Sequence, residues 1–181
     1  YVALSWLAWG EGSIVAAALL GFHMLCAVAN VAHMATHFGF TRYRWLNFAA
    51  EQLFDLGGMA WLEWQIAHQT HHNQPHSSID QQTNDYHSHL GVRIHRYIAH
   101  QPRHRYQHIY FWIFVSQYLM FRIFATTWWM VVNRQFVRHW HEIAAHLLAR
   151  AILIAQVVYA AYLYGWTHAV ALFLLYSMAY S

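Results

Sequence analysis

The sequence contains no lysine, a single cysteine, two prolines and few charged residues of any kind. Charged side chains make up 9% of its 181 residues, against roughly 25% in soluble globular domains. The lone Cys26 excludes an internal disulfide and leaves too few thiolates for a cysteine-based metal cluster. The formal net charge of +3 is small and scattered, which argues against nucleic acid as a partner. An ordinary soluble enzyme is therefore not the expected class.

Apolar residues and histidines are abundant in place of charged residues. Hydrophobic residues reach 59%, and there are 17 histidines. The stretches 14–31 and 151–181 carry no formal charge and approach or exceed the ~20 apolar residues of a transmembrane helix. Residues 106–132 are a third candidate. There, Arg122 favours a shorter span that ends near residue 121, because a buried arginine is costly in a membrane.

The remaining segments complete a membrane fold. Residues 1–9 resemble the end of an earlier span, and we expect 1–181 to be the N-terminal and middle part of a longer domain. The mixed spacing over 44–67 and 134–148 predicts amphipathic helices at the membrane interface, and the polar stretch 73–105 is expected in water. The predicted fold is all-α: an integral membrane helical bundle with three to four transmembrane helices plus interfacial amphipathic helices.

The side on which the polar loop lies follows from the arginines. Six of the ten cations fall between the first and the third predicted span. By the positive-inside tendency, this side of the membrane faces the cytoplasm. Most of the histidines lie on the same side, so we expect a histidine-rich cytoplasmic face.

Five histidines have helical spacing. His33 and His37 are four residues apart, and His68, His71 and His72 follow the pattern i, i+3, i+4, so each set shares a helix face. Neutral imidazole suits zinc, copper, iron and nickel. Five such ligands exceed the four of a tetrahedral zinc site. Redox iron, with more than one ion, fits the ligand count better.

Four motifs carry a family resemblance. The sequences HMATH (33–37), RWLN (44–47) and HQTHH (68–72) resemble the region of the first two histidine boxes in the integral-membrane fatty acid desaturases. QHIYF (107–111) is similar to the segment that opens the next span in the front-end, cytochrome b5-fusion branch. The resemblance runs from about residue 16 to the end. It implies an oxidoreductase of lipid metabolism that inserts a cis double bond into an acyl chain and reduces O2 to water.

The resemblance also implies the cofactors and partners. These are two Fe ions (a di-iron centre), O2 as co-substrate, a fatty acyl-CoA or acyl-lipid substrate, fused or separate cytochrome b5 as electron donor, membrane lipid, and a place in the endoplasmic reticulum membrane. Carried over to this sequence, the iron ligands are His33, His37, His68, His71 and His72. The third histidine box and the cytochrome b5 domain of the family are not in these 181 residues, so we expect this piece alone to be inactive.

Departures and supporting groups follow the second box. His76 stands where the family usually has asparagine, and Asp80 and Asp85 stand near its acidic pair. The imidazoles need acceptors that fix their tautomers. The nearest acidic candidates are Glu51, Asp55, Asp80 and Asp85.

Three alternatives remain open from sequence. One is a hydroxylase of the same superfamily. Another is a membrane electron carrier, with haem held between His23 and His168 in the apolar spans. The third is a catalytically silent, histidine-rich lipid-binding protein. The other histidines are expected at the surface or around the site, in the polar loop (His76, His87, His89, His95, His100, His104, His108) or on the polar side of an interfacial helix (His139, His141, His146).

Overall fold

The computed structural model describes residues 1–75, 77, 91–93, 98–116, 118–132 and 140–181. Within this part of the chain all regular structure is helical, which confirms the predicted all-α class. The helices are Val2–Ser5 (α1), Trp6–Gly10 (η1), Ile14–Cys26 (α2), Ala27–Ala32 (η2), His33–Thr36 (α3), Arg44–Glu51 (α4), Leu53–Gly57 (α5), Trp61–Asn73 (α6), Pro102–Tyr106 (η3), Gln107–Val115 (α8), Tyr118–Val132 (α9), Trp140–Tyr164 (α10) and Trp166–Tyr180 (α11).

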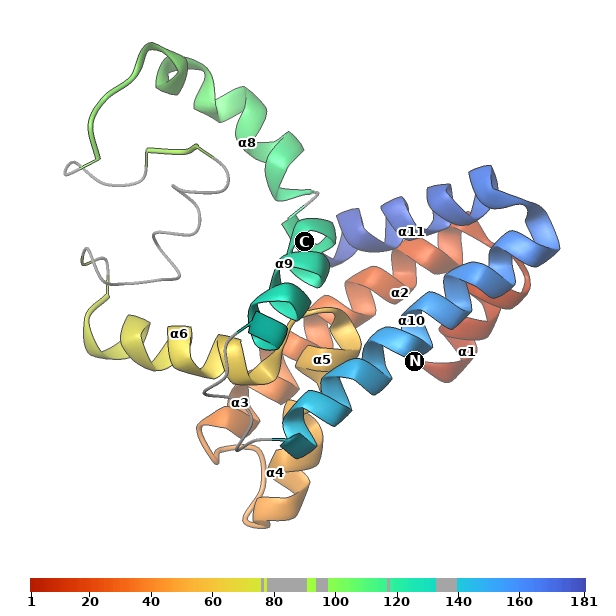
Figure 1. Ribbon diagram of the computed structural model, residues 1–181, viewed down its shortest axis with the longest axis horizontal. Helices are drawn as coiled ribbons and strands as arrows, with labels where there is room; N and C mark the ends of the chain where they lie inside the picture. Colours follow the sequence, from red (N-terminus) through yellow and green to blue (C-terminus); the bar gives the residue numbers. More distant parts are fainter. Residues whose placement is uncertain (76, 78–90, 94–97, 117, 133–139) are drawn as a thin grey trace.

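The long helices α2, α10 and α11 form one side of the molecule, and several of the shorter helices lie near one end of this group. Figure 1 shows α2, α10 and α11 lying along one another, with α3, α4, α5 and α6 gathered near one end of this group. Among the contacts between elements, α11 packs against both α2 and α10. Further apolar side chains, including Leu20, Met24 and Leu172, form the core between these helices.

The helix predicted for the first span is confirmed. Helices α2, η2 and α3 run without a break from Ile14 to Thr36, with a mean hydropathy of 2.1. The helix begins after Ser13, whose side chain accepts a hydrogen bond from the backbone N–H of Ala16, a common N-terminal cap. It continues past the predicted end at residue 31 and so brings His33 to its last turn.

The stretch 151–181, predicted as one span, is two helices. Helix α10 ends at Tyr164, and α11 returns alongside it (Figure 1). Gly165 makes the turn with φ of 84°, a conformation that glycine adopts without strain. The separate interfacial helix predicted over 134–148 is also wrong where it can be compared: residues 140–148 are the first turns of α10, and 133–139 lie outside the described residues.

The segment 44–67, predicted as a single amphipathic helix, is divided into α4, α5 and the start of α6. The chain turns at Gly58, where φ is 111°. Similarly, 106–132 contains α8 and α9, and α9 continues through Arg122 to Val132 instead of ending near residue 121. In the described residues, Ile14–Thr36 and Trp140–Tyr164 are long and apolar enough to cross a membrane. The count of three to four spans stays a prediction.

Helix α9 tolerates Arg122 because the guanidinium is paired. Its Nη2 lies 2.8 Å from Oε1 of Glu63 on α6. Thr126, one turn further along α9, donates a 2.7 Å hydrogen bond to the other carboxylate oxygen of Glu63. All three residues are buried. The ion pair thus fastens α6 to α9 inside the bundle.

A second buried network corrects the placement of His146. The sequence predicts this residue on the polar side of an interfacial helix, but it is 1% exposed. Its Nδ1 lies 2.7 Å from Oδ1 of Asp55 on α5, and its Nε2 lies 2.9 Å from Oγ1 of Thr127 on α9. This network links α5, α9 and α10. The neighbouring His141, by contrast, is exposed, with 53% of its side chain accessible.

Close packing of α2 on α11 depends on Gly21. A methyl group added there would lie 2.2 Å from the carbonyl oxygen of Tyr176 and 3.0 Å from Cβ of Ala179. We expect Gly21→Ala to lower the free energy of unfolding by about 2 kcal/mol, since overpacking outweighs the helix propensity that alanine gains. Thermal unfolding in detergent micelles measures the change, with Leu19→Ala on the exposed side of α2 as the control. An unchanged or raised melting temperature would show that α2 and α11 are not this close.

Candidate metal centre

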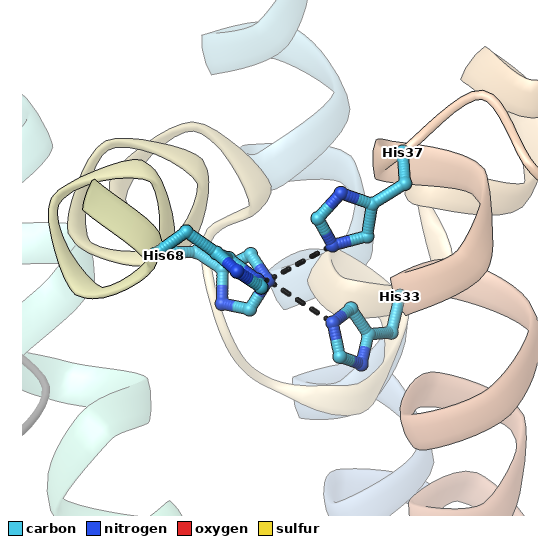
Figure 2. A group of neighbouring side chains, drawn as sticks. His33, His37 and His68 are labelled. Atoms are coloured by element: carbon cyan, nitrogen blue, oxygen red, sulfur yellow. Dashed lines mark hydrogen bonds between the residues drawn. The ribbon is translucent and has the colours of Figure 1, made fainter. Parts of the chain in front are cut away.

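Four of the five predicted ligands lie together. His33 is on α3 and His37 directly follows it, while His68 and His72 lie one turn apart on α6. The Nε2 atom of His68 is 3.0 Å from Nε2 of His33, 3.2 Å from that of His37 and 2.8 Å from that of His72. One nitrogen from each ring falls within 4.8 Å of every other. Figure 2 shows His33 and His37 reaching from one helix toward His68 on the other.

The segment between α3 and α6 folds back and brings these two helices together. After His37 it turns back, with Phe38 at φ of 53° and the N–H of Gly39 donating to the carbonyl of Met34 over 2.9 Å. Helices α4 and α5 then fold against α3 and η2. The backbone N–H of Trp61 donates to Oδ2 of Asp55 at 3.4 Å, which ties the first turn of α6 to α5.

The geometry fits a metal ion better than it fits hydrogen bonding. An imidazole nitrogen either donates one hydrogen or accepts one, so Nε2 of His68 cannot satisfy three neighbours at 2.8–3.2 Å. Adjacent nitrogens that each lie about 2.1 Å from one ion are about 3 Å apart when they meet at right angles at the metal. The four nitrogens therefore have the spacing of a ligand set. Their chemistry suits iron, zinc, copper or nickel.

The surroundings of His68 favour the neutral form of its imidazole. Burial lowers the pKa of His68 to about 4, and any charge on the neighbouring imidazoles of His33, His72, His37 and His71 lowers it in the same direction. At neutral pH its ring is uncharged, which is the form that binds a metal. His37 and His72 are exposed, so the group opens to solvent on one side.

Two cavities flank the histidines. One, of about 360 Å³, is lined by His37, His68 and His72 together with polar side chains of α6, including Gln65, Gln69 and Asn73. The other, of about 230 Å³, is mainly apolar. It lies beside His33 and is lined by Leu25, Val28, Phe54, Met59, Arg122 and Tyr180, among others. The histidine group thus has a polar side and a largely apolar side.

His71, the fifth predicted ligand, lies outside the four-histidine group. Its ring centroid is 6.4 Å from that of His68 and 6.1 Å from that of His72. Its part in metal binding stays a prediction.

The predicted acidic supports have other neighbours where the structure describes them. Asp55 is bonded to His146, and Glu51 lies beside Glu142. Burial first, and Glu142 second, raise the pKa of Glu51 to about 7. Asp80 and Asp85 lie outside the described residues, as do His76, His87, His89, His95 and His139.

Three other histidine placements can be compared with the structure. His100 and His108 are exposed, as predicted. His104 is buried, with Nδ1 accepting a 3.0 Å hydrogen bond from the N–H of Gln101 at the start of η3. The sequence alone did not predict this hydrogen bond between Gln101 and His104.

The haem alternative is wrong on geometry. Nε2 of His168 lies 2.8 Å from the carbonyl oxygen of Gly12, just before α2 begins. His23 is eleven residues further along, about 16 Å at the rise of a helix. The two imidazoles therefore cannot bind opposite sides of one haem iron.

Fold and site together define an all-α protein with apolar helices long enough to cross a membrane and a cluster of four histidines that could hold a metal ion. Comparison with known proteins narrows the class: the sequence model of the fatty acid desaturases matches residues 4–181. The chain belongs to the fatty acid desaturase family.

A curated relative agrees with this family. The chain is 25% identical over 143 residues to an sn-1 linoleoyl-lipid 6-desaturase from Arthrospira platensis. The match covers 76% of this chain and 39% of the relative, so the chain spans about two fifths of that protein's length. No solved structure matches.

Proposed function

We propose that this chain is part of an iron-dependent fatty acid desaturase, which in its complete form introduces a cis double bond into an acyl chain. The observation that carries the proposal is the convergence of four Nε2 atoms from His33, His37, His68 and His72 at the end of an apolar helix. Membership of the desaturase family supports the same function.

The proposed cofactor is a pair of Fe ions. The four histidines would hold part of it, with His71 and residues beyond this sequence as the other candidates. Iron, when bound, would supply the redox chemistry by which O2 is reduced to two molecules of water, with two hydrogens taken from the acyl chain and two further electrons, with two protons, taken from the electron donor and solvent. The protein contributes position: α3 and α6 fix the imidazoles, and burial keeps His68 uncharged.

The largely apolar cavity beside His33 suits the proposed substrate. Its lining of Leu25, Val28, Phe54 and Met59 can accept methylene groups and exclude water. We propose an acyl-lipid or acyl-CoA substrate, and the similarity to the Arthrospira linoleoyl-lipid desaturase favours the lipid form. Cytochrome b5, fused or separate, is the proposed electron donor.

The proposed location is the membrane, with the histidine group facing the cytoplasm. Two apolar helices and the family support the membrane. The arginine distribution supports the orientation, and the endoplasmic reticulum is the membrane that the resemblance to the cytochrome b5-fusion branch suggests.

Product analysis tests this function. The full-length protein containing this chain is expressed with cytochrome b5 and its reductase, and total acyl chains are analysed by mass spectrometry. We expect a new unsaturated acyl chain that disappears in His68→Ala and persists in His141→Ala, which changes an exposed histidine outside the group. Hydroxylated chains without new double bonds would assign the protein to the hydroxylases instead. If His68→Ala formed as much product as the wild type, the histidine group would not be required for the reaction.

A further inference from the structure

Trp64 occupies a special position behind the histidine group. It lies one turn before His68 on α6, and the two rings are stacked with centroids 4.0 Å apart and planes 20° apart. The other face of Trp64 stacks on Phe54 of α5, at 4.2 Å and 28°. Trp64 also contacts His33 edge to face, with ring centroids 5.4 Å apart and an angle of 77° between the ring planes. Phe54, Trp64 and His68 thus form one column of rings.

The column acts on the imidazole whose nitrogen is central to the group. Nε2 of His68 is the atom within 3.2 Å of three others, so rotation of this ring moves it relative to all of them. The terminal torsion of a histidine side chain is broad and poorly fixed by its own backbone. A flat neighbour stacked at 20° restricts that rotation. Trp64 is in turn held by Phe54, which is 1% exposed.

Trp64 also lines both cavities beside the histidines. It contributes to the largely apolar cavity with His33 and to the polar cavity with His37, His68 and His72. Its ring therefore stands between the two spaces while contacting one histidine from each helix.

We propose that Trp64 is a positioning residue of the metal centre, which fixes the plane of the His68 imidazole and thereby sets metal affinity and coordination geometry. The proposal rests on the proposed function in one respect: the histidine group must bind a metal. Trp64 offers no ligand atom itself. It acts through His68.

A purely structural role for Trp64 predicts a different result. Loss of a partly buried ring that packs against the core would lower the stability of the folded protein. It would leave the metal affinity and the spectrum of the folded fraction unchanged. The test must therefore measure affinity and stability separately.

The experiment titrates the full chain in detergent micelles with Co2+, whose visible absorption reports its ligand geometry. The variants are Trp64→Leu, which removes the flat ring, and Trp64→Phe, which retains one. Trp61→Leu is the matched control, because Trp61 lies on the same helix and also packs against the core. Melting temperatures of the metal-free proteins give the stability.

We expect Trp64→Leu to raise the Kd for Co2+ by about 10- to 100-fold, the range found when groups that orient a ligand are removed, and to shift the absorption bands. Trp64→Phe should stay within about threefold of the wild type, and Trp61→Leu should equal it. A wild-type Kd and spectrum in Trp64→Leu would overturn the proposal. Failure of the wild type itself to bind Co2+ would instead overturn the metal-binding function.

Phe54→Leu keeps the proposal testable if Trp64→Leu does not fold. This change leaves Trp64 in place and removes the ring that holds it from behind. We expect a smaller rise of the Kd, roughly 3- to 10-fold. An unchanged Kd in folded Phe54→Leu would show that the ring column does not govern the site.

Discussion

His68→Ala is expected to abolish tight metal binding, with the Kd for Fe2+ rising by more than about 100-fold. The expected loss exceeds the 10- to 100-fold typical of an outer group because the nitrogen removed is the one that lies within 3.2 Å of the three other rings. An anaerobic titration of the full chain with Fe2+, followed by metal analysis after desalting, measures the effect. His141→Ala is the control, since it removes an exposed imidazole.

The same titration decides the role of His71. The sequence pattern includes this residue among the ligands, whereas the structure leaves it outside the group of four. His71→Ala should therefore lose much less affinity than His68→Ala. Equal loss in the two variants would restore His71 to the ligand set, and unchanged iron binding in His68→Ala would contradict the four-histidine site.

Arg122→Leu is expected to cost about 3–5 kcal/mol of unfolding free energy, because it leaves the Glu63 carboxylate buried without its cation. Both side chains are less than a tenth exposed, and their charged atoms are 2.8 Å apart. Denaturant unfolding in mixed micelles measures the loss. The double variant Arg122→Leu/Glu63→Gln should recover a large part of it, since the uncompensated charge is then gone. Thr126 still finds an amide oxygen there.

Two outcomes would contradict this account of the ion pair. One is an Arg122→Leu variant as stable as the wild type. The other is a double variant that is no more stable than the single one. Because Glu63 precedes Trp64 and His68 on α6, loss of the anchor to α9 should also weaken Fe2+ binding, by less than His68→Ala does.

The sequence was sufficient for the parts of the fold that depend on local pattern. Uncharged runs located the helix that carries His33 in its last turn, and spacing selected the histidines. The spacing alone did not tell which of His71 and His72 would lie in the group of four with His68. Viewed along the helix axis, His71 lies about 60° from His68 on one side and His72 about 40° from it on the other. A neighbouring helix that contacts His68 is therefore closer to one of these two residues than to the other. The choice depends on how α3 and α6 cross.

Other features depend on contacts between distant residues. The turn at Gly165 carries little local signal inside an apolar run, yet it divides one predicted span into two helices. Burial of His146 requires Asp55, 91 residues away. The sequence predicts the end of a span at Arg122 because the segment alone does not show that Glu63 pairs with this arginine. Pairing across the bundle reverses the local cost of a buried charge, and no periodicity in the sequence reveals such a pairing.

X-ray absorption at the iron edge, on the full chain loaded anaerobically with Fe2+, tests the central claim most directly. If His33, His37, His68 and His72 hold the metal, the first shell contains nitrogen at about 2.1 Å with the outer-shell scattering of several imidazole rings, and this scattering weakens in His68→Ala. A first shell of oxygen alone, without imidazole scattering, would contradict the assignment of the four histidines as the metal centre.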